Sequence, residues 1–298
     1  KIKFKDMKRM LIIVENSEEE QYRTLRILEE AEKMGCKVDL INSSGMKFLT
    51  NKVFVKGKEL YFEEYDAIYS IGNSDRHHYF IMLATIKTGV RIWPSNKHLL
   101  MNDKFFEGIF LDNLGIRTPK TILLTSKEKV VVDKLVEEIG GYPCVAKKVT
   151  GSEGRYVCLV ESFDDLYKFL EKLPHPSISG KKGILLQEYI EESKGTDFRT
   201  YCVGDEILGA IQRTSQTDDF RANVSLGGVA EKIEVTAEME EFSRKIMKEG
   251  NFLFAGIDFI MSNSGLVAIE INTSADFKGF EKATGINVAE KIIKKFLE

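Results

Sequence analysis

Several marks of particular protein classes are missing from this sequence of 298 residues. No apolar run approaches the roughly 18 residues of a membrane span, and residues 1–5 are too few and too charged for a secretory signal. The net charge of -3 leaves no general basic surface for nucleic acid. The scattered cysteines suit a reducing compartment better than disulfides or zinc; they are Cys36, Cys144, Cys158 and Cys202. We therefore expect a cytoplasmic chain without a membrane or nucleic-acid partner.

The usual signatures of nucleophilic catalysis and of nucleotide binding by an α/β unit are also missing. The chain holds no convincing Ser/His/Asp or Cys/His constellation. Neither a G-x-G-x-x-G nor a Walker A pattern follows the first apolar run, residues 10–15. Three consecutive acids in residues 16–20 would instead repel a pyrophosphate. A dehydrogenase built on this N-terminal part is therefore an unfavourable alternative.

What is present at the N-terminus is an alternation of strand and helix. A capping box at Ser17 and Glu20 predicts a helix to about Met34. Short apolar runs predict four strands, at residues 10–15, 37–41, 65–71 and 91–94. This order predicts a small parallel sheet that serves as scaffold and substrate wall. His77 and His78 follow the third strand, where ligands often bind in such sheets, although a solvated helix start explains them more simply.

The most informative stretch is a hairpin pattern in residues 254–274. Two apolar runs flank the turn signal Ser-Asn-Ser-Gly; Asp258 lies on the first run, and Glu270 and Asn272 lie on the second. Glu270 and Asn272 are two residues apart, so they share one face of a strand. Neighbouring carboxylates repel, and burial raises the cost of their charge. A hard cation such as Mg²⁺, which shares its shell with substrate phosphates, removes that conflict; a solvated strand face is the alternative.

Whether Asp258 joins this face depends on the turn. A three-residue loop, residues 263–265 with Gly265 in the left-handed region, pairs Asp258 with Glu270. A two-residue loop would place Asp258 on the opposite face. We predict the three-residue loop, because glycine is the residue its third position needs. The other face then enters a core through Ile257, Phe259, Ile269 and Ile271.

Two lysines lie at positions that suggest a bound anion. Asp103 is a credible N-cap, and Lys104 in the first helical turn opposes the helix dipole unless an anion docks there; an exposed lysine is the alternative. Lys147 lies at the end of a predicted strand, and residues 151–154 form a Gly/Ser loop behind it. Glycines let backbone N–H groups approach a phosphate, and an ammonium supplies a point charge. A flexible hairpin tip explains the same pattern equally well.

Five segments in order resemble the ATP-grasp ligases over residues 102–298. They are Q-E-Y-I-E-E-S-K-G-T-D-F-R (187–199), D-D-F-R-A-N (218–223), G-I-D-F (256–259), E-I-N-T-S (270–274) and E-K-A-T-G-I-N-V-A (281–289). They look closest to the RimK-like branch, which attaches glutamate or related amino acids to a peptide or small-molecule carboxylate. The resemblance implies an α/β (α+β) ATP-grasp fold. Its parts would be an N-terminal α/β pre-ATP-grasp domain (1–98), a central lid subdomain (99–183) and a C-terminal antiparallel-sheet domain for metal and nucleotide (184–298).

The resemblance also implies roles for individual residues. Asp258, Glu270 and Asn272 would hold two ions, Mg²⁺ or Mn²⁺, that bridge the phosphates of ATP. Arg221 and Lys147 would act on the transferring phosphoryl group. Nucleotide contacts would come from Lys104, Lys147, Gly151, Ser152, Gly154, Glu188, Tyr189, Asp197, Arg221 and Asn223. Of these, Glu188 and Tyr189 would form the adenine hinge, and Asp197 would accept hydrogen bonds from the ribose.

Four further residues are candidates for substrate binding. Arg199 and Arg213 match a carboxylate bidentately, and Ser274 and Asp276 lie in the segment that borders the acceptor site in the family. Relatives often have N-x-S-P-G there, so the added acid of Asp276 suggests a cationic or amine-rich substrate. A second departure is Tyr156, which stands where relatives often have glycine and predicts a stiffer or aromatic-capped loop.

The implied reaction needs no nucleophilic side chain. A substrate carboxylate attacks the γ-phosphate of ATP, which yields ADP and an acyl phosphate, and an amine then displaces phosphate to form an amide. Positioning and charge neutralisation dominate both steps. The partners would be an amino acid and a peptide or small-molecule carboxylate, and a homo-oligomer is compatible with this sequence. The alternative from another class is an ATP-binding regulatory protein that kept the fold with little turnover.

Overall fold

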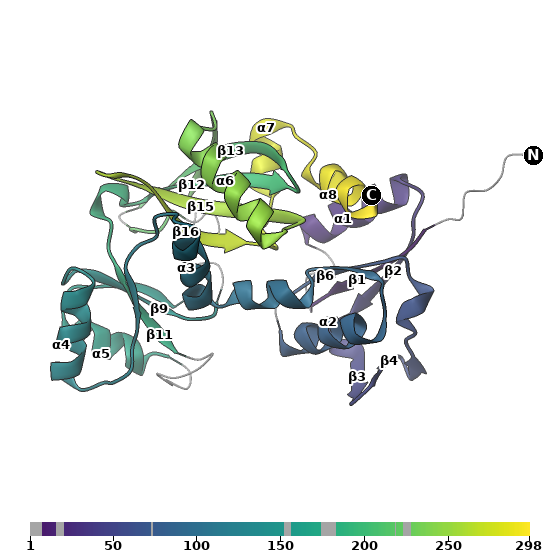
Figure 1. The fold of residues 1–298 in the computed structure, drawn as a ribbon, viewed down its shortest axis with the longest axis horizontal. Coiled ribbons are helices and arrows are strands. Elements are labelled where there is room, and N and C mark those ends of the chain that lie inside the picture. The colour runs from purple at the N-terminus through teal and green to yellow at the C-terminus, as the bar shows by residue number, and fades with distance from the viewer. Residues whose placement is uncertain are drawn as a thin grey trace, which may run out of the picture.

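The computed structural model describes residues 8–15, 21–72, 74–151, 156–173, 183–217, 219–222 and 228–298. Within these ranges the strands form four sheets, and three of them organise successive parts of the chain (Figure 1). None of the helices in the described ranges is long and apolar enough to cross a membrane. The capping box predicted at Ser17 and Glu20 lies outside the described residues.

The N-terminal part is built on a parallel sheet of order β2-β1-β6-β7. Its strands are β1 (Arg9–Val14), β2 (Lys37–Asn42), β6 (Ala67–Ile71) and β7 (Arg91–Trp93). Helices α1 (Tyr22–Lys33) and α8 (Val288–Leu297) cover one face, and α2 (Asp75–Lys87) covers the other (Figure 1). Alternate β1 residues therefore enter two cores, with Ile12 facing α1 and α8 and Leu11 facing α2. The predicted parallel sheet is confirmed.

A small antiparallel sheet beside it was not predicted. It consists of β3 (Met46–Leu49), β4 (Lys52–Val55) and β5 (Lys58–Glu59). These strands have between two and four residues, too few for a clear alternation of apolar and polar side chains. After β7, a 3₁₀ helix (Asn96–Asn102) leads into α3 (Lys104–Asn113).

The central part is an antiparallel sheet of order β10-β9-β11-β8. Its strands are β8 (Thr121–Leu123), β9 (Cys144–Lys148), β10 (Val157–Val160) and β11 (Ile184–Glu188). Helices α4 (Lys129–Glu138) and α5 (Phe163–Glu171) pack on it around a separate apolar core. Because β11 pairs with β8 and β9, the central sheet extends to Glu188, five residues past the boundary predicted at residue 183.

The C-terminal part is a five-stranded antiparallel sheet of order β14-β13-β12-β15-β16. Its strands are β12 (Thr196–Val203), β13 (Glu206–Thr214), β14 (Val229–Ile233), β15 (Phe254–Ser262) and β16 (Gly265–Asn272). Helix α6 (Ala237–Gly250) packs on it, α7 (Lys278–Thr284) follows β16, and α3 lies along β16 at the sheet edge (Figure 1). The final helix, α8, returns to the N-terminal sheet, where Phe296 meets Tyr69 edge-on.

The β15–β16 hairpin has the predicted pairing but reaches it by a different turn. Ser262 pairs with Gly265, so the loop has two residues rather than the three we predicted. The register then shifts by one at a β-bulge: Phe259 pairs with Ala268, whereas Asp258 pairs with Glu270. Ile269 is the extra residue of the bulge. It leaves the core expected for it and lines a cavity beside Glu270.

Candidate active site

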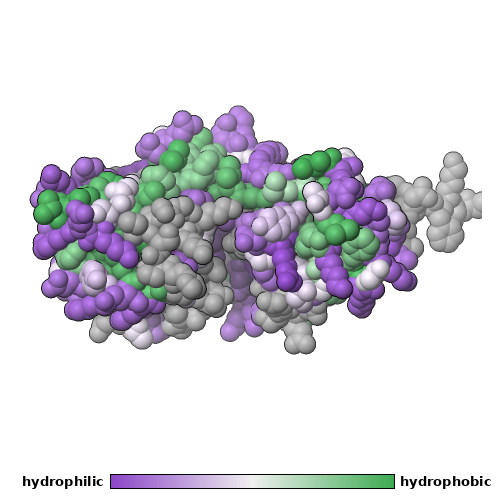
Figure 2. Space-filling view, turned by 90° about the horizontal axis from the view of Figure 1, so that it is seen from below, coloured by the Kyte–Doolittle hydropathy of each residue, from purple (hydrophilic) through white to green (hydrophobic). Residues whose placement is uncertain are grey.

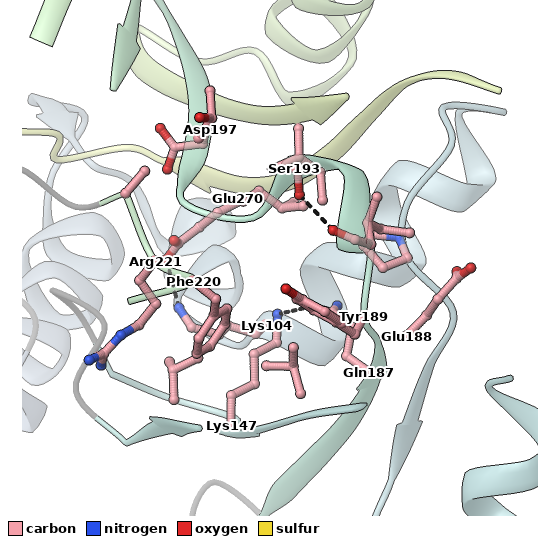
Figure 3. A pocket seen from close by; sticks show the side chains of 18 of the residues that line it. Lys104, Lys147, Gln187, Glu188, Tyr189, Ser193, Asp197, Phe220, Arg221 and Glu270 are labelled. Atoms are coloured by element: carbon pink, nitrogen blue, oxygen red, sulfur yellow. Dashed lines mark hydrogen bonds and ion pairs between the residues drawn. The ribbon is translucent and has the colours of Figure 1, made fainter. Parts of the chain in front are cut away.

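A cavity of about 160 Å³ opens between the central and C-terminal sheets (Figure 3). Its wall combines side chains from α3, from the ends of β9 and β11, from the start of β12 and from β16. The polar and aromatic side chains that line it are Lys104, Lys147, Lys148, Gln187, Glu188, Tyr189, Ser193, Thr196, Asp197, Phe220, Arg221 and Glu270. The cavity therefore collects residues that are far apart in the sequence.

Lys104 enters this cavity from the first turn of α3. The side chain of Asp103 caps that helix by accepting the N–H groups of Phe105 and Phe106. The Lys104 Nζ atom lies 2.6 Å from Glu270 Oε1 and donates to the Gly151 carbonyl at 3.0 Å. Burial lowers the pKa of Lys104, but the charges of Glu270 and Glu107 and the hydrogen bond to Glu270 together outweigh burial and hold the pKa above its ordinary value. A carboxylate thus compensates a lysine that the helix dipole disfavours.

Lys147 projects into the cavity from β9 and is almost fully buried (Figure 3). Its Nζ donates to Gln187 Oε1 at 2.9 Å, and the Gln187 amide in turn donates to Thr121 Oγ1 at 2.7 Å. Burial, together with the nearby Lys104 charge, lowers the pKa of Lys147 to about 8. Gln187 lies in the segment 187–199 that resembles the ATP-grasp ligases, but its hydrogen bond with Lys147 was not predicted.

Glu107 is a second residue whose contribution to the site was not predicted from the sequence. It lies one turn after Lys104 on α3, is 2% exposed, and accepts the backbone N–H of Ile271. That N–H belongs to the edge strand β16, between Glu270 and Asn272. Burial raises the pKa of Glu107 well above its usual range, and the Glu270 charge adds to this shift. An acid within an apolar helix face was the only available sequence signal.

Asp258 lies in a buried cluster of two acids and two arginines. Arg199 grips both of its carboxylate oxygens, with one contact of 2.6 Å, and Arg213 reaches it at 3.0 Å. Arg213 also donates to Asp197 Oδ2 at 2.8 Å. Burial opposes the charge of Asp258, but the two guanidinium groups bring its pKa below the ordinary value. The arginines predicted for a substrate carboxylate are therefore paired with acids of the chain in this structure.

The side chains predicted to hold a metal ion carry the oxygen donors that a hard cation prefers. Asp258 and Glu270 are register partners on adjacent strands, and the Asn272 amide lies 3.4 Å from Asp258 Oδ2. In this structure Lys104 pairs with Glu270 and Arg199 pairs with Asp258, so positive side chains neutralise both carboxylates. Among the described residues no group of three His, Cys, Asp or Glu side chains could hold a metal. An ion would thus share two carboxylates and one amide with oxygens of a phosphate, as Mg²⁺ does.

One side of the cavity is apolar and suits a flat ring. Tyr189 and Phe220 meet edge-on with ring centres 6.1 Å apart, and Ile260 and Ile269 lie nearby in the wall. The Glu188 backbone N–H donates to the Lys120 carbonyl at 2.8 Å, and its carboxylate accepts the Lys120 N–H at 3.1 Å. The predicted hinge is therefore held in place from outside the cavity.

The remaining predicted residues are divided between the cavity and its surroundings. Arg221 lines the wall and is paired with Asp219 at 2.6 Å, and Gly151 and Asp197 line it too. Ser274 and Asp276 are exposed outside the lining, where Arg23 of α1 donates to Ser274 Oγ at 3.1 Å. Three residues predicted for the nucleotide lie outside the described ranges: Ser152, Gly154 and Asn223.

Tyr156 marks the departure noted in the loop between β9 and β10. Its φ is +57°, in the left-handed region that favours glycine. The centre of its ring lies 4.8 Å from the ammonium of Lys148, a residue that lines the cavity, in a cation–π contact. A tyrosine thus adopts a backbone conformation that glycine enters more easily.

Comparison with known proteins identifies the class. The ATP-grasp ligase PsnB, solved with a minimal precursor, Mg and ADP, superposes with a TM-score of 0.67 at 18% identity over 96% of both chains. A RimK domain protein of Sphaerobacter thermophilus gives 0.70 at 16% identity over 95% of this chain and 98% of the other. Likeness at these identities establishes the fold. The chain has the fold of an ATP-grasp ligase.

The sequence comparisons then define the family. The model of the RimK-like ATP-grasp domain matches residues 98–296. A probable alpha-L-glutamate ligase of Legionella pneumophila is 31% identical over 281 residues, which cover 92% of this chain and 90% of the relative. The chain belongs to the RimK-like ATP-grasp family. It is an ATP-dependent carboxylate–amine ligase, and as an ATP-grasp enzyme it uses ATP with Mg²⁺.

Proposed function

We propose that this ligase joins an amino acid, glutamate or a similar one, to the carboxylate of a peptide, protein or small molecule. The observation that carries the proposal is the convergence of Lys104, Lys147 and Glu270 at one cavity, with Asp258 paired to Glu270 on the adjacent strand. Two cations and two carboxylates so close together suit a metal–triphosphate complex. The name of the Legionella relative supports glutamate, and the precursor bound to PsnB supports a peptide.

The nucleotide in this proposal lies along the cavity with its base in the apolar slot. Tyr189 and Phe220 flank the adenine, which also meets the backbone of the hinge at Glu188. Asp197 accepts from the ribose hydroxyls. Lys104 and Lys147 then contact the phosphate chain, with backbone N–H groups of the loop from Gly151 onwards. The triphosphate replaces Gln187 as the partner of Lys147. Its negative charge favours the protonated form of Lys147, which burial disfavours.

Asp258, Glu270 and Asn272 hold the metal in this proposal, as two ions of Mg²⁺ or Mn²⁺. The metal neutralises charge on the transferring phosphoryl group. Glu270 would be shared with a bound metal, so Lys104, its partner in this structure, would be available to the phosphates. Arg199, released from Asp258, would become available to a substrate carboxylate, and Arg213 would do so if it also left Asp197.

The reaction itself needs positioning more than proton transfer. The substrate carboxylate displaces ADP from the γ-phosphate, and Arg221 and Lys147 offset the charge that develops there. The amine nitrogen then attacks the acyl carbon, phosphate leaves, and the amine proton passes to solvent. Asp276 is exposed two residues after Ser274, in the segment predicted to border the acceptor site, so we infer that it favours an amine substrate with an additional positive charge. The four free cysteines suit a cytoplasmic location.

A substrate screen tests this function. Pairs of amino acids and peptides are incubated with ATP and Mg²⁺, ADP release is recorded, and products are identified by mass spectrometry. The proposal predicts ADP release that requires both an acid and an amine, together with a product that has lost one water relative to its two substrates. ATP binding without ADP release under any substrate pair would instead favour the regulatory alternative.

A further inference from the structure

The two carboxylates proposed to hold the metal are neutralised in this structure by other side chains of the same chain. Lys104 Nζ lies 2.6 Å from Glu270 Oε1 (Figure 3). On the neighbouring strand, Arg199 contacts both oxygens of Asp258, and Arg213 reaches Asp258 Oδ2 at 3.0 Å. A divalent ion that arrived alone would have to displace these positive side chains or be repelled by them.

The other charged side chains nearby do not make the site more attractive to a free cation. Lys147 adds a positive charge to the same cavity, and its Nζ donates to an uncharged amide, that of Gln187, at 2.9 Å. Asp197 is paired with Arg213 at 2.8 Å. Glu107 on α3 adds little negative charge, because burial raises its pKa well above the usual range. A lone Mg²⁺ ion would therefore meet carboxylates that are already paired, with a further cation beside them.

Restricted access does not protect these carboxylates from ions in the solvent. The side chain of Glu270 is 31% exposed, compared with 14% for Lys104, so a small ion can reach the carboxylate from water. Polar side chains also lie in the hollow between the central and N-terminal parts, on the side of the molecule that Figure 2 shows. The ion pair, rather than a closed wall, is therefore what stands between Glu270 and a free cation.

We propose that Lys104 is an internal counter-ion that keeps free divalent cations off Glu270 until a nucleotide binds. This role rests on the function proposed above, in which Glu270 and Asp258 hold the metal and Lys104 meets the phosphates. A triphosphate brings more negative charge than one divalent ion brings positive charge, so it can bind Lys104 and the metal together. Lys104 then exchanges a carboxylate for a phosphate, and Glu270 exchanges a lysine for the metal. Metal binding and nucleotide binding are therefore positively coupled.

Two titrations of the full chain test this role without any acid or amine substrate. The first measures the affinity for Mn²⁺, a spectroscopic substitute for Mg²⁺, by electron spin resonance in the absence of nucleotide. The second measures the affinity for a non-hydrolysable ATP analogue with Mg²⁺ by calorimetry. Lys104→Met leaves Glu270 without its cation, so it should strengthen the binding of free Mn²⁺ and weaken the binding of the analogue, each by about tenfold or more. A lysine that only stabilised the fold would not change the two affinities in opposite directions.

Three further variants locate the change in affinity. Lys104→Met combined with Glu270→Gln should lose the gain in Mn²⁺ affinity, because the carboxylate is gone. Lys104→Arg keeps the positive charge and should bind free Mn²⁺ as weakly as the wild type. The matched control is Lys52→Met: Lys52 pairs with Glu59 at 2.8 Å between β4 and β5, outside the lining of the cavity, and its loss should leave both affinities unchanged. Thermal melting verifies that each variant is folded.

The possible results separate this role from the proposed function. Tight binding of Mn²⁺ by the wild type without nucleotide, or a Lys104→Met variant that binds free Mn²⁺ no more tightly than the wild type, would overturn the counter-ion role and leave the ligase function standing. A wild type that does not bind the analogue with Mg²⁺ would refute the nucleotide site on which both proposals depend.

Discussion

Replacement of Glu107 is the perturbation whose effect follows most directly from the structure. Its buried carboxyl group accepts the N–H of Ile271, which lies between Glu270 and Asn272 on the edge strand β16. Glu107→Leu keeps a side chain of similar volume but removes the acceptor. The Ile271 N–H then has no partner in a buried place, and the strand that carries two proposed metal ligands loses its anchor on α3.

The size of the effect follows from that lost hydrogen bond. A buried donor left without a partner costs about 1–3 kcal/mol. If the activation free energy rises by this full amount, the rate falls by about 5- to 150-fold. The loss should appear as a lower kcat and a higher Mg²⁺ concentration at half-maximal rate. The KM for ATP should change less, because the apolar slot at Tyr189 and Phe220 is untouched.

Glu107→Gln is the matched control for this experiment. The amide keeps an acceptor oxygen for Ile271, and burial already favours the neutral form of the acid by raising its pKa. We expect kcat within about threefold of wild type, since the hydrogen bond is retained. Both variants are assayed by ADP release over a range of Mg²⁺ concentrations. A Leu variant with wild-type Mg²⁺ dependence, or a Gln variant as impaired as the Leu variant, would refute the anchoring argument.

Three further predictions concern the cavity and the exposed residue Asp276. Glu270→Ala should abolish ADP formation without unfolding the protein, as ADP release and circular dichroism will show; unchanged turnover would remove Glu270 from the site. Asp276→Gly should alter the preference among amine substrates more than the affinity for ATP, and the reverse result would place Asp276 elsewhere. ATP binds the charged form of Lys147, whose pKa is about 8, so calorimetry should show affinity falling as pH rises above 8. Lys147→Met should lack that dependence, and a variant that retains it would assign the titration to another group.

The sequence predicted the fold well where the pattern was local. The parallel sheet follows from short apolar runs separated by helices, and Asp103 proved to be the N-cap expected at the start of α3. The strands β3 to β5 were missed because two to four residues show no usable period. The extension of the central sheet to Glu188 was missed because β11 joins this sheet by pairing with β8 and β9. The sequence of one strand does not show which other strands it pairs with.

The hairpin shows how a correct pairing can follow from a wrong premise. Asp258 does pair with Glu270, but the turn has two residues and the bulge at Ile269 restores the alignment. A bulge depends on how both strands twist against their neighbours, so the turn sequence alone does not encode it. The same limit hid Glu107, because only the packing of α3 along β16 shows that this acid meets a backbone N–H.

In the proposed reaction, Asp258, Glu270 and the neighbouring lysines position ATP with its metal so that a substrate carboxylate attacks the γ-phosphate. To follow that attack, the substrate carboxylate is labelled with heavy oxygen and the released inorganic phosphate is analysed by mass spectrometry. We expect phosphate that carries one heavy oxygen, formed in step with the amide product. Amide formation with unlabelled phosphate would show that no acyl phosphate forms.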